Sequence, residues 1–329
     1  MSLRTPVASL VSLVLVLGAI DAFRVAGAQE RAANAQGVET IQIRPNMFVI
    51  FGAGANITVH TGPEGVVLVD SGSMARAGEA RAAVRAISAQ PVRLIVNTSA
   101  DPDHVGGNET LARGGLSIVP NAFNAGTSQA AIVAHENVLL RMSAPTGRAA
   151  AFPLGAWPTE TYTSRTKSMY FNDDGIQVIR EVGAHSDGDS VVFFRRTDVV
   201  ATGDILDLRQ FPVIDAALGG SIQGEIDSLN RLLELAIPAM PLIDKEDRTL
   251  LVPGHGRISD HADLVEYRDM VTIIRDTIQR LVDKGMTLQQ VKAADPAQGY
   301  RARFGRDSGP WTTDMFVEAV FRGLRRSAS

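Results

Sequence analysis

Hydrophobic residues recur along this chain in short runs that turn-forming residues separate. The first four runs consist of β-type residues, and Gly, Pro or Asn stands between them. They cover residues 41–43, 47–50, 57–60 and 65–69. Short strands with turn signals between them predict an antiparallel meander.

After this meander the pattern changes to an alternation of helix and strand. An Ala- and Arg-rich stretch has helical spacing, and Pro91 then restarts the chain as a buried strand. The expected order is helix 74–88, strand 92–96, polar loop 97–107, helix 126–142 and loop 148–166. The last loop carries Phe152 and Trp157, which either line a substrate pocket or anchor the loop by hydrophobic contact.

The second half repeats this plan. A further meander precedes more helices, in the order strands 168–171, 176–180, 190–194 and 199–202, helix 225–236, strand 249–252, and helices 262–282, 287–293 and 312–324. Two sheets with helices on their outer faces fit this alternation. We expect one main domain over 40–260 and a helical extension, 261–329, packed on the same domain.

The N-terminus has the features of an export signal. Arg4 precedes an apolar run over 7–20, and Ala26-Gly27-Ala28 supplies small residues for cleavage before Gln29. We expect a signal peptide over 1–28 and a flexible lead-in over 29–39. The mature protein is then expected to be periplasmic or secreted, without a membrane segment.

Composition narrows the possible partners. The net charge is −4 and aromatic residues make up 5% of the chain, so nucleic acid is not an expected partner. The absence of cysteine excludes disulfides, thiol nucleophiles and cysteine-ligated metals. A small-molecule substrate is the expected partner, and the sequence says nothing about oligomeric state.

Histidine and aspartate residues cluster where predicted strands end. Each of them alone has an ordinary interpretation as a turn former, a cap or a satisfied histidine. Together they supply the imidazole and carboxylate ligands that a divalent ion prefers. These residues are Asp101, Asp103, His104, His185, Asp204 and His255.

This set resembles the metallo-β-lactamase fold superfamily, whose motif is H-x-H-x-D-H followed by a distant His, a bridging Asp and a last His. The match spans about 40–260 and keeps the order of the family. Asp103-His104, His185, Asp204 and His255 stand at the corresponding positions, and Asp70 would lie behind the ligands. The resemblance implies a four-layer αββα sandwich of the α/β class, with its site at one edge.

The chain departs from the family at the first two histidines of the motif. Ser99 and Asp101 stand there, and a hydroxyl is a poor ligand because it stays protonated near neutral pH. We therefore expect one tightly bound zinc ion, with iron or manganese also compatible, and a weak or absent second ion near Asp101 and His185. The expected ligands of the tight ion are Asp103, His104, Asp204 and His255.

The resemblance implies an exported hydrolase that attacks an ester, lactone, lactam or thioester carbonyl with metal-bound hydroxide. Asp103 would orient the water, Asp101 would serve as ligand or general base, and His185 would polarise the carbonyl or protonate the leaving group. Asp187 and Asp189 are both candidates to orient His185. The alternative is a catalytically inactive ligand-binding protein on the same fold.

Three other histidines have less connection with this chemistry. His60 is expected to pack inside a strand, and His261 to stand next to a helix cap at Asp260. His135 is expected on a helix, where a surface role is at least as plausible as a role in the site.

Overall fold

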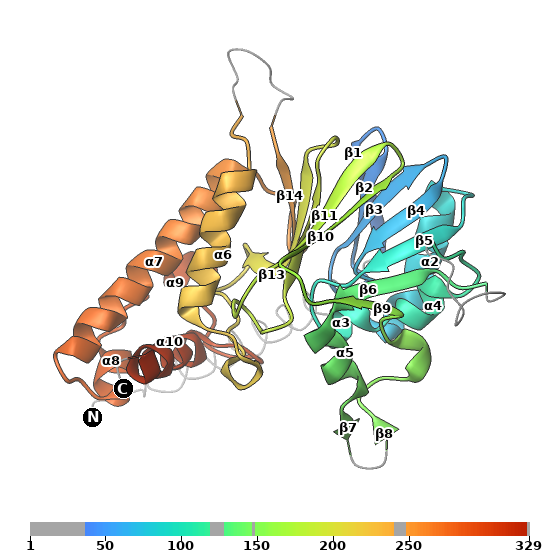
Figure 1. Ribbon diagram of the computed structural model, residues 1–329. Helices are drawn as coiled ribbons and strands as arrows, with labels where there is room; N and C mark the ends of the chain where they lie inside the picture. Colours follow the sequence, from blue (N-terminus) through green and yellow to red (C-terminus); the bar gives the residue numbers. More distant parts are fainter. Residues whose placement is uncertain (1–36, 119–127, 147–148, 240–247, 328–329) are drawn as a thin grey trace, which may run out of the picture. The chain divides into compact units, whose positions relative to one another are not determined.

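Two β-sheets lie face to face in the computed structural model, and helices cover their outer faces (Figure 1). The structure describes residues 37–118, 128–146, 149–239 and 248–327. The predicted signal peptide and most of the lead-in lie outside the described residues. Within them the αββα sandwich is confirmed.

The first sheet contains seven strands among the described residues, in the order β1-β2-β3-β4-β5-β6-β9. The strands β1 to β4 form the predicted antiparallel meander, and β4, β5, β6 and β9 run parallel. Their bounds are β1 Glu39–Arg44, β2 Met47–Phe51, β3 Ile57–Gly62, β4 Gly65–Val69, β5 Val92–Val96, β6 Ala131–His135 and β9 Glu160–Tyr162.

The second sheet has five described strands in sequence order, antiparallel except for the parallel pair β13–β14. Their bounds are β10 Thr166–Phe171, β11 Asp174–Arg180, β12 Ser190–Phe194, β13 Val199–Asp207 and β14 Leu250–His255. A small hairpin, β7 Pro145–Thr146 with β8 Ala149–Ala150, stands apart from both sheets.

Helices of the first half cover the first sheet, and those of the second half cover the second sheet (Figure 1). The first set is η1 Met74–Arg76, α2 Ala77–Ile87, α3 Pro102–Val105, α4 Asn108–Ala112, α5 Glu136–Ser143 and η2 Leu154–Ala156. The second set is η3 Ala216–Leu218, α6 Ile222–Leu235, α7 His261–Asp283, α8 Leu288–Ala293, η4 Gln298–Tyr300, α9 Arg301–Phe304 and α10 Thr313–Ser327.

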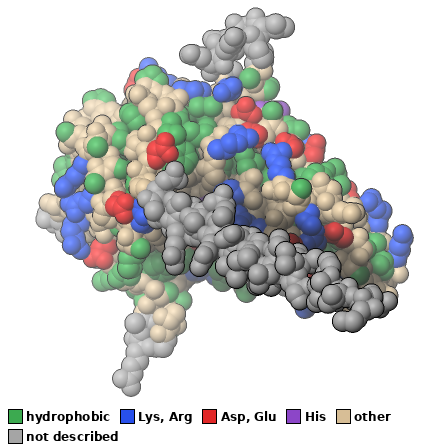
Figure 2. Space-filling view, turned by 180° about the vertical axis from the view of Figure 1, so that it is seen from behind, with side chains coloured by type: hydrophobic (Ala, Val, Ile, Leu, Met, Phe, Trp, Pro, Cys, Tyr) green, Lys and Arg blue, Asp and Glu red, His purple; other side chains and the backbone are tan. Residues whose placement is uncertain are grey.

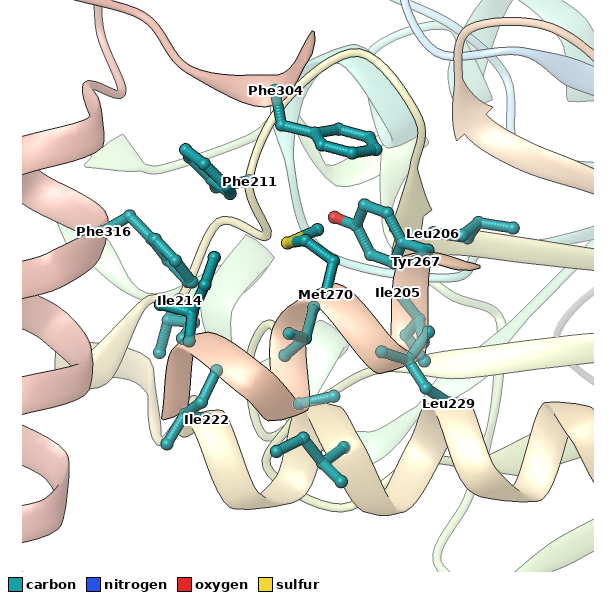
Figure 3. Close-up of a cluster of buried hydrophobic side chains, with 14 of the residues drawn as sticks. Ile205, Leu206, Phe211, Ile214, Ile222, Leu229, Tyr267, Met270, Phe304 and Phe316 are labelled. Atoms are coloured by element: carbon teal, nitrogen blue, oxygen red, sulfur yellow. The ribbon is translucent and has the colours of Figure 1, made fainter. Parts of the chain in front are cut away.

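Two buried clusters hold these layers together. One lies between the sheets and joins residues such as Val67 and Leu94 to Val178 and Phe194. The other lies between the second sheet and its helices, where Phe211 stacks on Phe316 with ring centroids 4.9 Å apart (Figure 3). The second cluster therefore fixes the chain that follows β13.

The prediction of a helix over 126–142 is wrong in its first part. Residues 131–135 form β6, which pairs with both β5 and β9, and the helix begins only at Glu136. Alanine favours a helix, but a strand buried on both faces of a parallel sheet also appears as a continuous apolar run. Pairing with the neighbouring strands β5 and β9 decides for a strand over a helix here.

Two predicted loops also contain regular structure. The loop over 97–107 includes α3, because Pro102 suits the first helical turn and Asp101 precedes it in extended conformation. The loop over 148–166 includes η2 and β9, where Phe152 and Trp157 pack against Val138 and Met142. The anchoring role is thus the one that the structure supports.

Charged side chains of both signs are interspersed over the face of the molecule opposite to that in Figure 1 (Figure 2). In the part of the chain that the structure describes, no helix is both long and apolar enough to cross a membrane.

Candidate metal centre

Six imidazole and carboxylate side chains form two groups of three. We name them the His104 group (Asp103, His104 and His255) and the His185 group (Asp101, His185 and Asp204). In each group, one ligand atom from every residue lies within 4.8 Å of the others. The structure therefore brings together all six residues that the sequence singled out.

The His104 group connects the turn after β5 to the end of β14. His255 Nε2 lies 3.0 Å from Asp103 Oδ2 and 3.7 Å from Asp204 Oδ1. His104 Nε2 lies 3.2 Å from the same Asp204 oxygen. Asp204, a member of the His185 group, thus also contacts both histidines of the His104 group.

Asp70 holds His104 from behind. The imidazole Nδ1 donates to Asp70 Oδ2 at 2.8 Å, and Asp70 also accepts from Thr98 N and Thr98 Oγ1 at 2.8 and 2.7 Å. Because Nδ1 carries the proton in this pair, Nε2 is the nitrogen that faces the site. Asp70 has a φ of 62°, an unusual backbone conformation that Asp tolerates better than most residues.

Backbone contacts set the position of α3, which carries His104. Ser71 donates to the His104 carbonyl from both N and Oγ, at 2.8 and 2.9 Å. Gly107 follows the helix so closely that a Cβ there would lie 2.1 Å from the Ser71 carbonyl oxygen. A larger residue at 107 would push α3, and His104 with it, away from β4.

The His185 group has a different support. His185 Nε2 lies 2.9 Å from Asp101 Oδ2, and its Nδ1 lies 2.9 Å from the carbonyl oxygen of Val213. Neither predicted partner orients the ring directly: Asp187 pairs with Arg141, and Asp189 accepts from Ser186 N and Oγ.

Ser99 is buried and does not reach the site as a free ligand. Its hydroxyl donates to Asp101 Oδ2 at 2.9 Å, and the Asp101 amide donates back to Ser99 Oγ at 3.2 Å. Ser99 and Asp101 therefore form one hydrogen-bonded unit, in which Ser99 orients the Asp101 carboxylate.

The charges of the centre depend on one another. Burial alone would raise the pKa of Asp204, but His104, His185 and His255 outweigh it and hold that pKa far below its ordinary value. Burial would likewise lower the pKa of His104, yet Asp204 and Asp70 raise it well above the usual range. The carboxylates require positive charge beside them, which imidazolium or a divalent cation can supply.

The donor set fits a divalent cation. Within the described chain, His104 Nε2 and Asp204 Oδ1 are buried yet make no hydrogen bond of acceptable geometry, although they face each other. A buried polar atom without a partner is costly, and a metal ion would satisfy both atoms. The residues that would hold it are those of the His104 group together with Asp204.

Two further acids are buried behind the His185 group. Burial raises the pKa of Asp189 to about 6 against the opposing effect of His185. Burial, reinforced by the charge of Asp189, raises the pKa of Glu225 well above its usual range. Neither Glu225 carboxyl oxygen has a hydrogen-bond partner among the described residues, which favours its neutral form.

The remaining histidines lie apart from these two groups. His60 is buried, with Nε2 2.9 Å from Asn46 Nδ2, and Asp260 caps the helix that begins at His261. The expected helical surface position of His135 is wrong. It ends β6, is fully buried, and accepts a hydrogen bond from Asn137 N.

Sequence reasoning missed two supports of the centre. Val213 acts through its main-chain carbonyl, a group that every residue has, so the residue type gives no sign of this role. The other support is the pair of Asp207 and Arg209, which follows Asp204 and lies beside His255. The sequence did contain a sign of this pair, because Asp207 is a second aspartate that follows Asp204 in β13.

Comparisons with known proteins agree with this architecture. The sequence model of the metallo-β-lactamase superfamily matches residues 51–115. A metallo-β-lactamase from Pontibacter korlensis shares 17% identity at a TM-score of 0.54, covering 71% of this chain and 99% of its own. TMB-1 shares 14% identity at a TM-score of 0.52, with coverages of 72% and 98%.

A larger enzyme matches more of this chain. The stereoselective inverting sec-alkylsulfatase Pisa1 from Pseudomonas sp. shares 17% identity at a TM-score of 0.58, covering 87% of this chain. The match covers 50% of the sulfatase chain. A search of the curated proteins gave no match.

The protein has the metallo-β-lactamase fold.

Proposed function

We propose that the protein is an exported, metal-dependent hydrolase that attacks the carbonyl of an ester, lactone, lactam or thioester. The observation that carries this proposal is the convergence of the two groups on Asp204, with His104 Nε2 buried 3.2 Å from Asp204 Oδ1 but without hydrogen-bond geometry. A divalent ion at this position would activate water and polarise a carbonyl. Export rests on the apolar N-terminal segment 7–20.

We infer one tightly bound ion. The His104 group and Asp204 offer two imidazoles and two carboxylates, and Asp70 fixes the tautomer of His104. The His185 group has a single imidazole, because Ser99 and Asp101 replace histidines, so a second ion would bind weakly there. Zinc suits the mixed donors, and the carboxylates also admit iron or manganese.

The protein's own residues supply the proton transfers. Asp101 Oδ2 accepts from His185 Nε2 and from Ser99 Oγ, and these contacts support Asp101 as the general base and His185 as the acid. His185 Nδ1 donates to the Val213 carbonyl, so the proton that can move is the one on Nε2. His185 would protonate the leaving group, and Asp103 would orient the attacking water.

The second candidate is a catalytically inactive ligand-binding protein. The direct contact between Asp101 and His185 favours it, because two groups satisfied by each other need no ion. His104 Nε2 and Asp204 Oδ1 support the hydrolase instead, because without an ion these buried atoms have only a 3.2 Å contact with each other that lacks hydrogen-bond geometry.

Metal content of the purified mature protein tests the proposal. Elemental mass spectrometry is applied before and after chelation to wild type and Asp103→Ala, with Asp276→Ala as the matched control. Asp276 is a half-exposed carboxylate on α7 that pairs with Arg275. We expect about one equivalent in wild type and in the control, and loss of metal in Asp103→Ala.

Other stoichiometries give different conclusions. About two equivalents would show that Asp101 and His185 complete a second site. No metal after supplementation would contradict the hydrolase and leave the ligand-binding alternative. Activity that appears only in Ser99→His, Asp101→His would also favour that alternative.

A further inference from the structure

A second pocket, of about 430 Å³, opens at the end of the first sheet where β5 begins. One wall is α2 with the turn that follows it, and another is the turn after α4. Its base is apolar, because Val84 and Leu111 line it and each is only 3% exposed. Such a volume is within the range of small-molecule sites.

The charged side chains among the described residues that line this pocket are all arginines. They are Arg81, Arg85 and Arg113, and we name the cavity the arginine pocket. The whole chain has 36 acidic and 32 basic residues, so composition does not predict an acid-free group of three arginines. Three like charges around one cavity repel one another, and an anion inside it would relieve that repulsion.

Another pocket of the molecule shows a balanced group of charges. Arg44, Arg196 and Arg248 line it, but so do Asp173 and Asp198. Arg196 pairs with Asp173, and Arg44 donates to the Arg248 carbonyl. The arginine pocket differs, because none of the described residues in its walls is an acid.

The helices on either side do not neutralise the arginine pocket. Glu109 on α4 pairs with Arg113 at 2.8 Å, whereas Arg81 and Arg85 make no hydrogen bond or ion pair with any described residue. Arg85 stands in the last turn of α2, where the helix dipole favours a cation. This does not explain Arg81, because two like charges four residues apart destabilise a helix.

The turn after α4 brings the other wall close to Arg81. Gly114 has a φ of +81°, and a Cβ there would lie 3.8 Å from Arg81 Nη2. The Leu116 amide donates to the Val92 carbonyl at 3.0 Å, which ties this turn to the start of β5. Arg81 and Arg113 therefore approach the cavity from two elements, and the wall that carries Arg113 is in place before a ligand binds.

Three guanidinium groups suit a phosphate monoester. Such a group has three terminal oxygens and a charge of about −2 at neutral pH. Guanidinium N–H groups bind phosphate oxygens in parallel pairs, which a point charge does not do. A carboxylate would balance only one of the three charges, while carbon atoms attached to a phosphate could cover Val84 and Leu111 at the base.

We propose that the arginine pocket binds a phosphate monoester group, carried by a small molecule or by a lipid headgroup, with Arg81, Arg85 and Arg113 as the residues that hold it. This site goes beyond the proposed hydrolase and does not depend on it. The strand β5 begins at the pocket and ends before the turn that carries Asp101 and Asp103, and its five residues span roughly 16 Å.

Calorimetry on the metal-loaded protein tests this binding. The probe is phenylphosphonate, which mimics a phosphate monoester and whose carbon–phosphorus bond resists hydrolysis, and benzyl alcohol is its neutral counterpart. We expect phenylphosphonate to bind and benzyl alcohol to bind much more weakly. Arg81→Gln and Arg85→Gln should each weaken phenylphosphonate binding about 10-fold, the lower end for the loss of one charge-assisted hydrogen bond.

A matched control separates recognition from helix stability. Arg280→Gln removes the last-turn arginine of α7, outside the pocket, just as Arg85→Gln removes that of α2. The Arg280 variant should bind the probe as wild type does, and the unfolding midpoint of each variant is recorded. Equal losses of affinity in Arg85→Gln and Arg280→Gln would overturn the inference.

A second control locates the probe. Asp103→Ala alters the candidate metal centre and should leave phenylphosphonate binding unchanged, because the arginine pocket lies at the other end of β5. Loss of binding in Asp103→Ala together with full binding in Arg81→Gln would place the phosphonate at the metal centre. That result would overturn the inference and leave the hydrolase proposal intact.

Flotation with vesicles distinguishes the two sources of the phosphate. The vesicles contain phosphatidylcholine with or without phosphatidate, whose headgroup is a phosphate monoester. Flotation that requires phosphatidate, and that Arg81→Gln and Arg85→Gln abolish, would assign the lipid headgroup. Arginine-dependent binding of phenylphosphonate without flotation would assign a small molecule. Binding that depends on neither arginine in both assays would overturn the inference.

Discussion

In the His104 group the Asp70 carboxylate accepts a hydrogen bond from Nδ1 of His104, whereas in the His185 group the main-chain carbonyl of Val213 accepts it from Nδ1 of His185. Asp70 and Ser71 at the end of β4 and Thr98 after β5 hold the ring and the backbone of His104. The support of His185 comes from Val213, on a loop that distant residues fix. Ser99 and Asp101 both belong to the second arrangement, so the two groups differ in their donor atoms as well as in their support.

Histidines at positions 99 and 101 would remove this difference. Ser99→His, Asp101→His supplies two imidazoles beside His185, and we expect the metal content to rise from about one equivalent to about two. Elemental mass spectrometry measures the change. Asp101→His alone is the control, and a double variant that still holds one ion would show that the surroundings of Ser99, rather than its side chain, limit the second site.

The buried carboxyl of Asp189, behind His185, predicts that the free energy of unfolding depends on pH differently in wild type and in a variant without this carboxyl. Because the pKa of Asp189 is raised from 3.8 to about 6 on folding, the native state binds more protons than the unfolded state between these values. Its contribution to the free energy of unfolding is therefore present below pH 4 and lost as the pH rises to about 6, by up to about 3 kcal/mol.

The variant Asp189→Asn cannot ionise and keeps the contact with Ser186. Compared with wild type, the chelated variant should lose less stability between pH 4 and pH 6 in denaturant titrations. Parallel curves for the two proteins would contradict the assigned pKa.

Removing the Asp70 carboxylate, which holds Nδ1 of His104, should weaken metal binding by the His104 group. Asp70→Ala eliminates the partner of Nδ1, and outer partners of this kind contribute about 10- to 100-fold to metal affinity. Competition with a chelator of known affinity measures this effect. Asp174→Ala, which removes another buried carboxylate of the fold, is the control for general destabilisation; equal loss of affinity there would assign the effect to folding.

The smallest expected effect concerns the loop that supports His185. Trp311 Nε1 donates to the Pro212 carbonyl at 3.2 Å, and Trp311→Phe removes this bond at a cost of about 1 kcal/mol. Because the loop holds His185 and not His104, hydrolysis should fall while metal content stays at one equivalent. Loss of the ion instead would mean that metal binding by the His104 group depends on the position of His185.

Local pattern predicted most of the elements and the clusters of histidine and aspartate at strand ends, because both are expressed in side-chain type. The meander and these clusters follow from turns, periodicity and spacing, whereas the resemblance implied the place of Asp70 behind His104. The strand over 131–135 did not, because its identity depends on pairing with β5 and β9. The Val213 carbonyl and the Asp207–Arg209 clamp depend on the path of a loop in three dimensions, and periodicity does not contain that information.

The same loop has a consequence for the order in which the protein is built. Phe304 accepts from the Phe211 amide, Tyr267 donates to the Gln210 carbonyl, and Trp311 holds Pro212. A ribosome releases all six candidate ligands before it releases residues 304–311. The residues that hold His104 therefore all precede the last tenth of the protein, whereas His185 acquires its fixed orientation only when that last tenth has folded onto the second sheet.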